Sequence, residues 1–183
     1  VAKDNQVKTI VKSKSMATEE VHLNPYLEKA GIEVAETDLG EWIIQLAGQR
    51  PSHMVMPAIH LTRDDVADIF SKEVEERLTS DIPRLVKLAR ARLRPKFMRA
   101  EMGISGGNIA VAETGTVVLI TNEGNARLTT TLPKVHVAVV GLEKLVEKFA
   151  DVAPILKALP RSATAQLLTS YVTMVTGPTP TDD

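Results

Sequence analysis

The chain has 183 residues, of which 44% are hydrophobic and 25% charged, so it is long enough to bury the core of one globular domain. Its formal net charge of -1 creates no field that would attract nucleic acid or an anionic membrane, and we expect neither as a partner. It contains no cysteine, which excludes disulfides, thiolate metal sites and thiol catalysis within the chain and fits a reducing, cytoplasmic location. No apolar stretch approaches the roughly 20 residues of a membrane-spanning helix.

The first third of the chain alternates short β-branched runs with helical patterns, which is typical of βαβ units with parallel strands. Thr18 is the expected cap of the first helix and Gly31 its stop. The predicted elements are a strand at 7–11, a helix at 18–30, a strand at 32–36, a short helix at 40–47 and an apolar run at 53–56 that Pro57 closes. We therefore predict an α/β fold in which helices flank a sheet.

Two amphipathic helices are predicted in the middle of the chain. Thr62 and Asp65 have the spacing of a capping box, with Asp in place of Glu, and the apolar stripe of this helix runs to Leu78. The second helix spans about 81–94 and is expected to end at Pro95. We interpret the region at about 62–100 as a helical insertion in a single domain that spans residues 1–183.

The last third returns to β structure. Two β runs at 109–112 and 116–121, joined by three residues that end in Gly115, predict a hairpin with a bulged turn. The continuous apolar run at 135–140 predicts a strand that is buried on both faces. The elements expected after it are a helix that starts at Gly141, is interrupted at Pro154 and ends at Pro160, and a last strand at 171–175.

The two ends of the chain suggest a piece of a longer protein. It begins at Val1 rather than at a methionine, and residues 177–183 form a polar tail rich in Pro and Thr. We expect truncation at both ends.

The first candidate site follows the first predicted strand. Lys12, Ser13, Lys14 and Ser15 stand before a predicted helix, and ligands of open α/β sheets bind beyond the carboxyl ends of the strands. Amide groups at a helix start favour an anion, and two lysines add positive charge. The alternative is a solvated loop, which Lys and Ser also populate routinely.

The second candidate is the predicted hairpin turn. Glu113, followed by Thr114 and Gly115, is placed to project into a cleft and to act as a base or as an acyl-transfer nucleophile. A polar turn residue without a chemical role is the alternative, and the spacing alone favours it.

The third candidate is the segment that starts at Asn122, Glu123 and Gly124 and continues through Asn125 to Arg127. Asn and Gly permit left-handed backbone, so a turn is predicted here. Arg127 just beyond it has the fork geometry that binds a carboxylate or phosphate. A surface loop with a solvated arginine is an equally good interpretation.

Two other sets of residues favour structural roles. The four histidines lack metal-ligand spacing, so we expect no metal site, and His136 is interpreted as a packed strand residue. A basic run lies on and after the second middle helix, without the interleaved aromatics of a nucleic-acid surface. It is better explained as a solvated face or a partner-docking surface, and comprises Arg84, Lys87, Arg90, Arg92, Arg94, Lys96 and Arg99.

The candidate segments also carry a family likeness. The chain resembles the LUD-domain (lactate utilisation) family, and within it the LutB-type iron–sulfur subunits, over nearly its whole length. The motifs that carry the resemblance are residues 11–16 with 18–20, 36–41, 112–115, 121–127, 132–134, 160–164 and 171–174.

This resemblance implies more than the residues do. It implies a fold like the NagB/RpiA/CoA transferase-like proteins and a part in a complex that oxidises L-lactate to pyruvate, with LutA- and LutC-like subunits as partners. It also implies electron transfer through 4Fe–4S clusters. Because LutB-type proteins hold these clusters through cysteines of a C-terminal ferredoxin-like region, and this chain has none, we expect no cofactor in this piece.

Three hypotheses of function remain open from the sequence. In the leading one the chain is a scaffold or substrate domain of a lactate-oxidising complex, and residue chemistry alone suggests Arg127 and Lys14 for the carboxylate of a 2-hydroxy or 2-oxo acid and Glu113 as base. In the second, Glu113 is the nucleophile of a CoA transferase-like reaction. In the third, the domain has no catalytic role and docks partner subunits through its basic helix.

Overall fold

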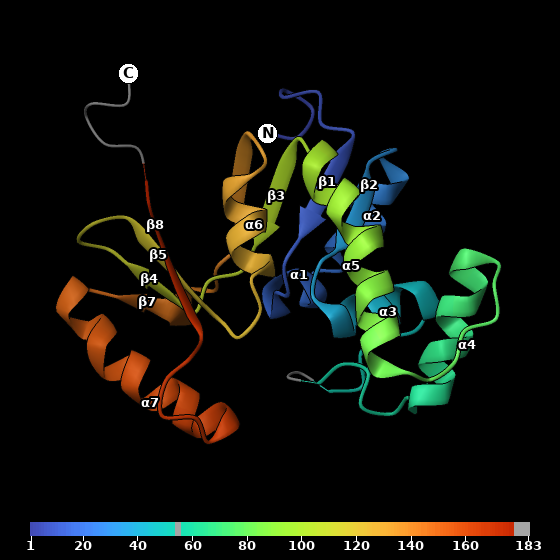
Figure 1. Cartoon of the computed structure of the whole chain (residues 1–183). Helices are drawn as coiled ribbons and strands as arrows, with labels where there is room; N and C mark the ends of the chain where they lie inside the picture. The colour runs from blue at the N-terminus through green and yellow to red at the C-terminus, as the bar shows by residue number, and fades with distance from the viewer. Residues whose placement is uncertain (54–55, 178–183) are drawn as a thin grey trace.

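The computed structural model describes residues 1–53 and 56–177, which fold into two four-stranded sheets with helices packed against them (Figure 1). The first sheet is parallel throughout and has the order β2-β1-β3-β6. The second is mixed and has the order β7-β4-β5-β8. The predicted α/β class, with helices that flank a sheet, is confirmed.

The parallel sheet places side chains alternately on its two faces. Its strands are β1 (Thr9–Lys12), β2 (Glu33–Glu36), β3 (Met102–Ser105) and β6 (Val135–Ala138). Val11 is in register with Ala35 and Gly103, so these three face one side. Ile10 and Lys12 face the other.

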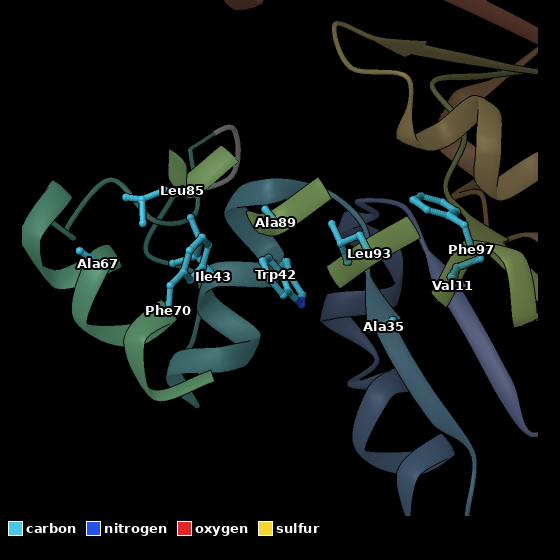
Figure 2. Close-up of a cluster of buried hydrophobic side chains, with 10 residues drawn as sticks. All are labelled: Val11, Ala35, Trp42, Ile43, Ala67, Phe70, Leu85, Ala89, Leu93 and Phe97. Carbon is cyan, nitrogen blue, oxygen red and sulfur yellow. The ribbon is translucent and has the colours of Figure 1, made fainter. Parts of the chain in front are cut away.

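Three helices lie on the side of the sheet that carries Val11, two of them against its strands and one packed on the other two (Figure 1). These are α3 (Leu39–Ala47), α4 (Arg63–Val74) and α5 (Ile82–Arg99). Figure 2 shows their shared core, in which the rings of Trp42 and Phe70 lie 5.1 Å apart between centroids. Both rings are almost fully buried, and each such burial stabilises the fold by about 1.5–3 kcal/mol. The middle helices thus share one core with the parallel sheet.

The opposite face is covered by two short helices. α1 (Met16–Glu20) and α2 (Leu23–Lys29) connect β1 to β2. Leu23 and Leu27 of α2 pack against the buried Ile10, Val34 and Ile104. The parallel sheet is therefore the middle layer of three.

α6 (Asn125–Thr131) lies between the two sheets and contacts both β3 and β8 (Figure 1). Its position depends on Gly103, because a Cβ at that residue would overlap the carbonyl oxygen of Thr129. The helix backbone therefore rests directly on β3.

The second sheet is built around a hairpin of β4 (Ile109–Val111) and β5 (Thr116–Thr121), as predicted. β8 (Tyr171–Thr176) pairs antiparallel with β5, and β7 (Leu145–Val146) pairs parallel with β4. α7 (Val152–Thr164) covers the sheet with Val152, Ile155 and Leu156, which pack on Ile109, Val111 and Val118.

Two helix predictions in the first half are wrong in their limits. The helix expected at 18–30 is two helices, because His22 adopts a left-handed conformation with φ 51°. Ser15, rather than Thr18, caps the first one. α5 continues past Pro95 to Arg99, since the proline removes only one helical hydrogen bond and the buried Leu93 and Phe97 anchor the helix on both sides of it.

The helix expected from Gly141 is wrong in its first half. Two 3-10 turns, Leu142–Lys144 (η1) and Phe149–Asp151 (η2), flank β7 there, and α7 begins only at Val152. Pro154 lies in the first turn of α7, where a proline has no hydrogen bond to break. Pro160 lies inside α7, which continues to Thr164.

The remaining differences concern strands. The run at 135–140 forms β6 only as far as Ala138 and is half-buried, because it is the edge strand of its sheet. β3 and α6 were not predicted. The apolar run expected at 53–56 falls partly on residues 54–55, which lie outside the described residues, and His53 and Met56 belong to no strand. Within the described residues, no helix has both the length and the apolar character to cross a membrane.

Candidate functional site

A cleft of about 670 Å³ opens between the two sheets. Its walls are the segments that follow β1, β2, β3 and β6, the end of β5, and residues of α1, α6 and α7. The volume is within the range of about 300–1,000 Å³ that is typical of small-molecule sites. A smaller hollow of about 180 Å³ between α3, α4 and α5 is lined almost entirely by apolar side chains, so the larger cleft is the candidate site.

The position of the cleft follows from the parallel pairing. The carboxyl ends of parallel strands meet at one edge of a sheet, and small-molecule sites of α/β folds form there. Ser13 follows β1, Asp38 follows β2, Gly106 follows β3 and Val139 follows β6, and all four line the cleft. Residues more than 100 positions apart in the chain are thereby brought to one site.

Lys14 is the most enclosed cation of this cleft. Its Nζ lies 3.1 Å from Oε1 of Glu41, and its side chain is 27% exposed. Lys144, the other lining lysine, is 47% exposed and 3.9 Å from Glu143.

Glu41 belongs to the first turn of α3, which Asp38 caps by accepting the amide proton of Gly40 at 3.0 Å. The carboxyl of Glu41 is buried, and its Oε2 has no hydrogen-bond partner among the described residues. Burial, together with the adjacent Asp38 carboxyl, raises the pKa of Glu41 to about 8, against the opposing effect of Lys14. A carboxyl that is neutral at pH 7 therefore lies next to Lys14.

Lys12 does not reach the cleft. It faces α1 and α2 from the fully buried side of β1, and its Nζ contacts Thr18 Oγ1 at 3.0 Å, Glu19 Oε1 at 2.8 Å and Glu36 Oε1 at 2.9 Å. Burial alone would lower the pKa of Lys12, but the two carboxylates raise it above its ordinary value. Lys12 is therefore a structural cation that ties α1 and β2 to β1.

The other predicted residues of the β1 loop and of the 122–125 segment gather at the cleft. Ser13, Ser15, Asn122, Glu123 and Asn125 all line it. Asn122 ties β5 to the end of α7, because its Nδ2 donates to Gln166 Oε1 at 3.0 Å. Asn125 is the first residue of α6, and its Oδ1 is buried without a hydrogen-bond partner in the described part of the chain.

Besides Lys12, four further predicted site residues lie outside the cleft. Glu113, Thr114 and Gly115 form the β4–β5 turn, at the end of β5 away from the cleft. The first β5 residue that lines the cleft, Leu119, is four residues beyond Gly115, which is roughly 13 Å at about 3.3 Å per residue. There Glu113 Oε2 accepts the backbone N–H of Phe149 at 2.8 Å. Arg127 is exposed on α6 and does not line the cleft. The structure therefore does not bring Glu113 and Arg127 together with Lys14.

Two groups near the cleft were not identified from the sequence. Asp38 carries a local signal, because an acidic residue before a helical pattern is a typical cap. Glu41 carries no such local signal, since a glutamate in a first helical turn is ordinarily solvated.

His136, interpreted as a packed residue, is half-buried on β6 with its Nε2 2.8 Å from Ser105 Oγ.

The metal-ligating side chains of the described residues do not gather into a metal site. Within residues 1–53 and 56–177, no three His, Asp or Glu side chains are placed to hold a metal ion. The sequence has no cysteine, so its residues do not fit an iron–sulfur cluster held by thiolates.

Comparison with known proteins assigns this α/β chain to a family. The sequence model of the LUD domain matches residues 2–183. The chain belongs to the LUD-domain family. The resemblance seen in the sequence motifs is thereby confirmed.

Several curated relatives carry the name lactate utilization protein B. That of Bacillus subtilis is 50% identical over 172 residues, which cover 93% of this chain and 36% of the relative. Those of Bacillus licheniformis and Geobacillus kaustophilus are 49% and 47% identical over 179 residues, which cover 97% of this chain and 38% of each relative. This LUD domain thus spans well under half the length of these relatives.

A solved structure, that of a DUF162 family protein from Deinococcus radiodurans, aligns with 96% of this chain and 82% of its own. The TM-score is 0.38 and the sequence identity 17%, which is too distant to add to the fold assignment.

Proposed function

We propose that this LUD domain binds the small organic acid of a lactate-utilisation protein, as part of a complex that oxidises L-lactate to pyruvate. The cleft at the carboxyl ends of β1, β2 and β3 is the observation that carries this proposal. The ligand class comes from the relatives named lactate utilization protein B.

The charges around the cleft favour a small anion over a large one. Four acidic residues and two lysines line it, namely Glu20, Asp38, Glu123, Glu143, Lys14 and Lys144. This balance repels a polyanion such as an acyl-CoA. A monocarboxylate needs only one local positive charge, and Lys14 supplies it.

The electron-transfer part of the proposed function lies outside these residues. Because the chain has no cysteine, any 4Fe–4S cluster of the whole protein is held by residues outside the 183. Residues outside the 183 are also proposed to contact the LutA- and LutC-like subunits, in addition to any contact made by the surface of this domain. The role of this domain in the proposed complex is to hold the acid.

Acyl transfer through Glu113 is not favoured by any observation of the cleft. The turn that carries this carboxylate lies at the other end of β5, and its Oε2 is engaged by the backbone of Phe149.

A pair of matched tryptophan variants tests the proposal. Ala163 and Ala158 are both exposed on α7, but only Ala163 lines the cleft. Calorimetric titration with L-lactate and pyruvate is expected to show saturable binding to the wild-type protein and to Ala158→Trp, and loss of binding in Ala163→Trp. No binding to the wild type, or equal binding to both variants, would overturn the proposal.

A further inference from the structure

The cleft is much larger than a three-carbon acid, so such a ligand needs a subsite that fixes its position. At about 670 Å³ the cleft has room for a larger molecule. The part of its wall that offers a cation with limited solvent access is the corner formed by Lys14 and Asp38, beyond the ends of β1 and β2. An ammonium there interacts more strongly with an anion than one in open water.

We propose that Lys14, Asp38 and Glu41 form a carboxylate subsite of the cleft, in which the Lys14 ammonium, positioned by Glu41, binds the carboxylate of a 2-hydroxy or 2-oxo acid. This inference rests on the proposed function and names the subsite of the same cleft. Lys14 and Asp38 line the cleft, and Glu41 Oε1 lies 3.1 Å behind the Lys14 ammonium.

The protonation of Glu41 decides whether the subsite attracts an anion. If both carboxyls were ionised, the three side chains would carry two negative charges and one positive charge, and an added carboxylate would be repelled. A proton on Glu41 leaves one negative charge, on Asp38, which caps α3. The buried and unpartnered Oε2 of Glu41 favours this neutral form, since an ionised oxygen there would be desolvated without compensation.

The surroundings of Glu41 contain few other charges that could change this balance. Asp38 and Lys14 are the charged groups that act on its carboxyl. α4 packs against α3 through apolar side chains such as Val66 and Phe70. On β2, Glu36 contacts Lys12 and not Lys14.

The subsite predicts a pH-dependent affinity that one substitution removes. Because the pKa of Glu41 is about 8, L-lactate should bind about tenfold more weakly at pH 9 than at pH 7. Glu41→Gln is neutral at both pH values and should change less than about twofold. Glu20→Gln, which removes another carboxyl of the cleft wall, should keep the tenfold change.

Calorimetric titration of these proteins with L-lactate and with its neutral analogue lactamide is the test. Lactamide should bind at least about tenfold more weakly than lactate at pH 7, and Lys14→Met should bind the two alike, with thermal unfolding to show that the variant is folded. Lactate binding that is equal at pH 7 and 9, or unchanged in Lys14→Met, would overturn the subsite and leave the proposed function standing. Absence of lactate binding to the wild type at both pH values would overturn both.

Discussion

Lys12 Nζ lies 2.9 Å from Glu36 Oε1, and the two side chains are only 0% and 4% exposed. Further hydrogen bonds support the ammonium and the carboxylate oxygen that form this buried ion pair, whereas Glu36 Oε2 has no hydrogen-bond partner among the described residues. Here Thr18 and Glu19 contact the ammonium, and Asn24 Nδ2 donates to Glu36 Oε1 at 2.6 Å. The pair therefore holds α1 and α2 against the sheet directly behind the cleft.

Removing the ammonium of this pair should strongly destabilise the fold. Lys12→Met leaves the buried Glu36 carboxylate without its cation, and we expect a loss of about 3–5 kcal/mol in the free energy of unfolding. Urea denaturation measures it. The exposed control Lys3→Met should change by less than about 0.5 kcal/mol. A Lys12→Met, Glu36→Leu double variant should recover much of the loss, and if it is as unstable as the single variant, the pairing is not the cause.

The contact of α6 with β3 can be tested with two glycines. Gly103→Ala should lower the free energy of unfolding by about 1–3 kcal/mol, because the new methyl group overlaps the Thr129 carbonyl oxygen. Gly124, just before α6, has a φ of -81° and open space where a Cβ would be. Gly124→Ala changes only the N-cap of α6 and should therefore cost less than about 0.5 kcal/mol, and equal losses in both variants would contradict the contact.

The neutral Glu41 also has a signature in the stability of the protein. The unfolded chain releases this proton near the ordinary pKa of 4.5, whereas the folded chain keeps it up to about 8. Between these values the folded state binds more protons, so the free energy of unfolding should fall by up to about 1.4 kcal/mol per pH unit as the pH rises. Relative to Glu41→Gln, urea denaturation at pH 5 and pH 8 should show this loss in the wild type. Glu20→Gln should leave the pH dependence as in the wild type, and parallel curves for the wild type and Glu41→Gln would contradict a raised pKa.

Local signals predict much of the fold. The capping box of Thr62 and Asp65 is present at the start of α4, because it needs only residues that are three positions apart. The hairpin turn at Gly115, with φ 66°, follows from glycine chemistry in the same way. α6 has no such signal, since it ends in a run of three threonines, which are poor helix formers, and is held by its long-range contact with Gly103.

The residues of the candidate site also differ in whether a local sequence signal predicts them or only tertiary packing determines their role. Lys14 is predicted by its position beyond the first parallel strand, whereas Asn122 and Asn125 are predicted as part of a turn that contains Asn and Gly. Lys12 and Lys14 look alike in sequence, but the last residue of β1 faces the buried helices and the loop residue faces the cleft. The role of Glu41 depends on burial under tertiary packing, which no local pattern reports.

The basic face of α5 is interpreted as a solvated face or a partner-docking surface rather than as a source of stability. Arg90 and Arg94 are exposed, so Arg90→Glu with Arg94→Glu should change the free energy of unfolding by less than about 1 kcal/mol. If LutA- or LutC-like subunits dock there, co-purification with them should be lost in this variant and kept in Lys29→Glu, an exposed charge reversal on α2. Co-purification that survives the double reversal would contradict docking through α5.

The most direct test of the cleft as the acid site is to follow backbone amide resonances by NMR during titration with L-lactate. We predict saturable shifts at residues 13–16, 106–108 and 121–125, which meet at the carboxyl ends of the strands. The β4–β5 turn at residues 113–115 should remain unchanged, because it lies at the opposite end of the hairpin. Shifts confined to that turn, or no saturable shift at any residue, would contradict the cleft as the site where this domain binds its acid.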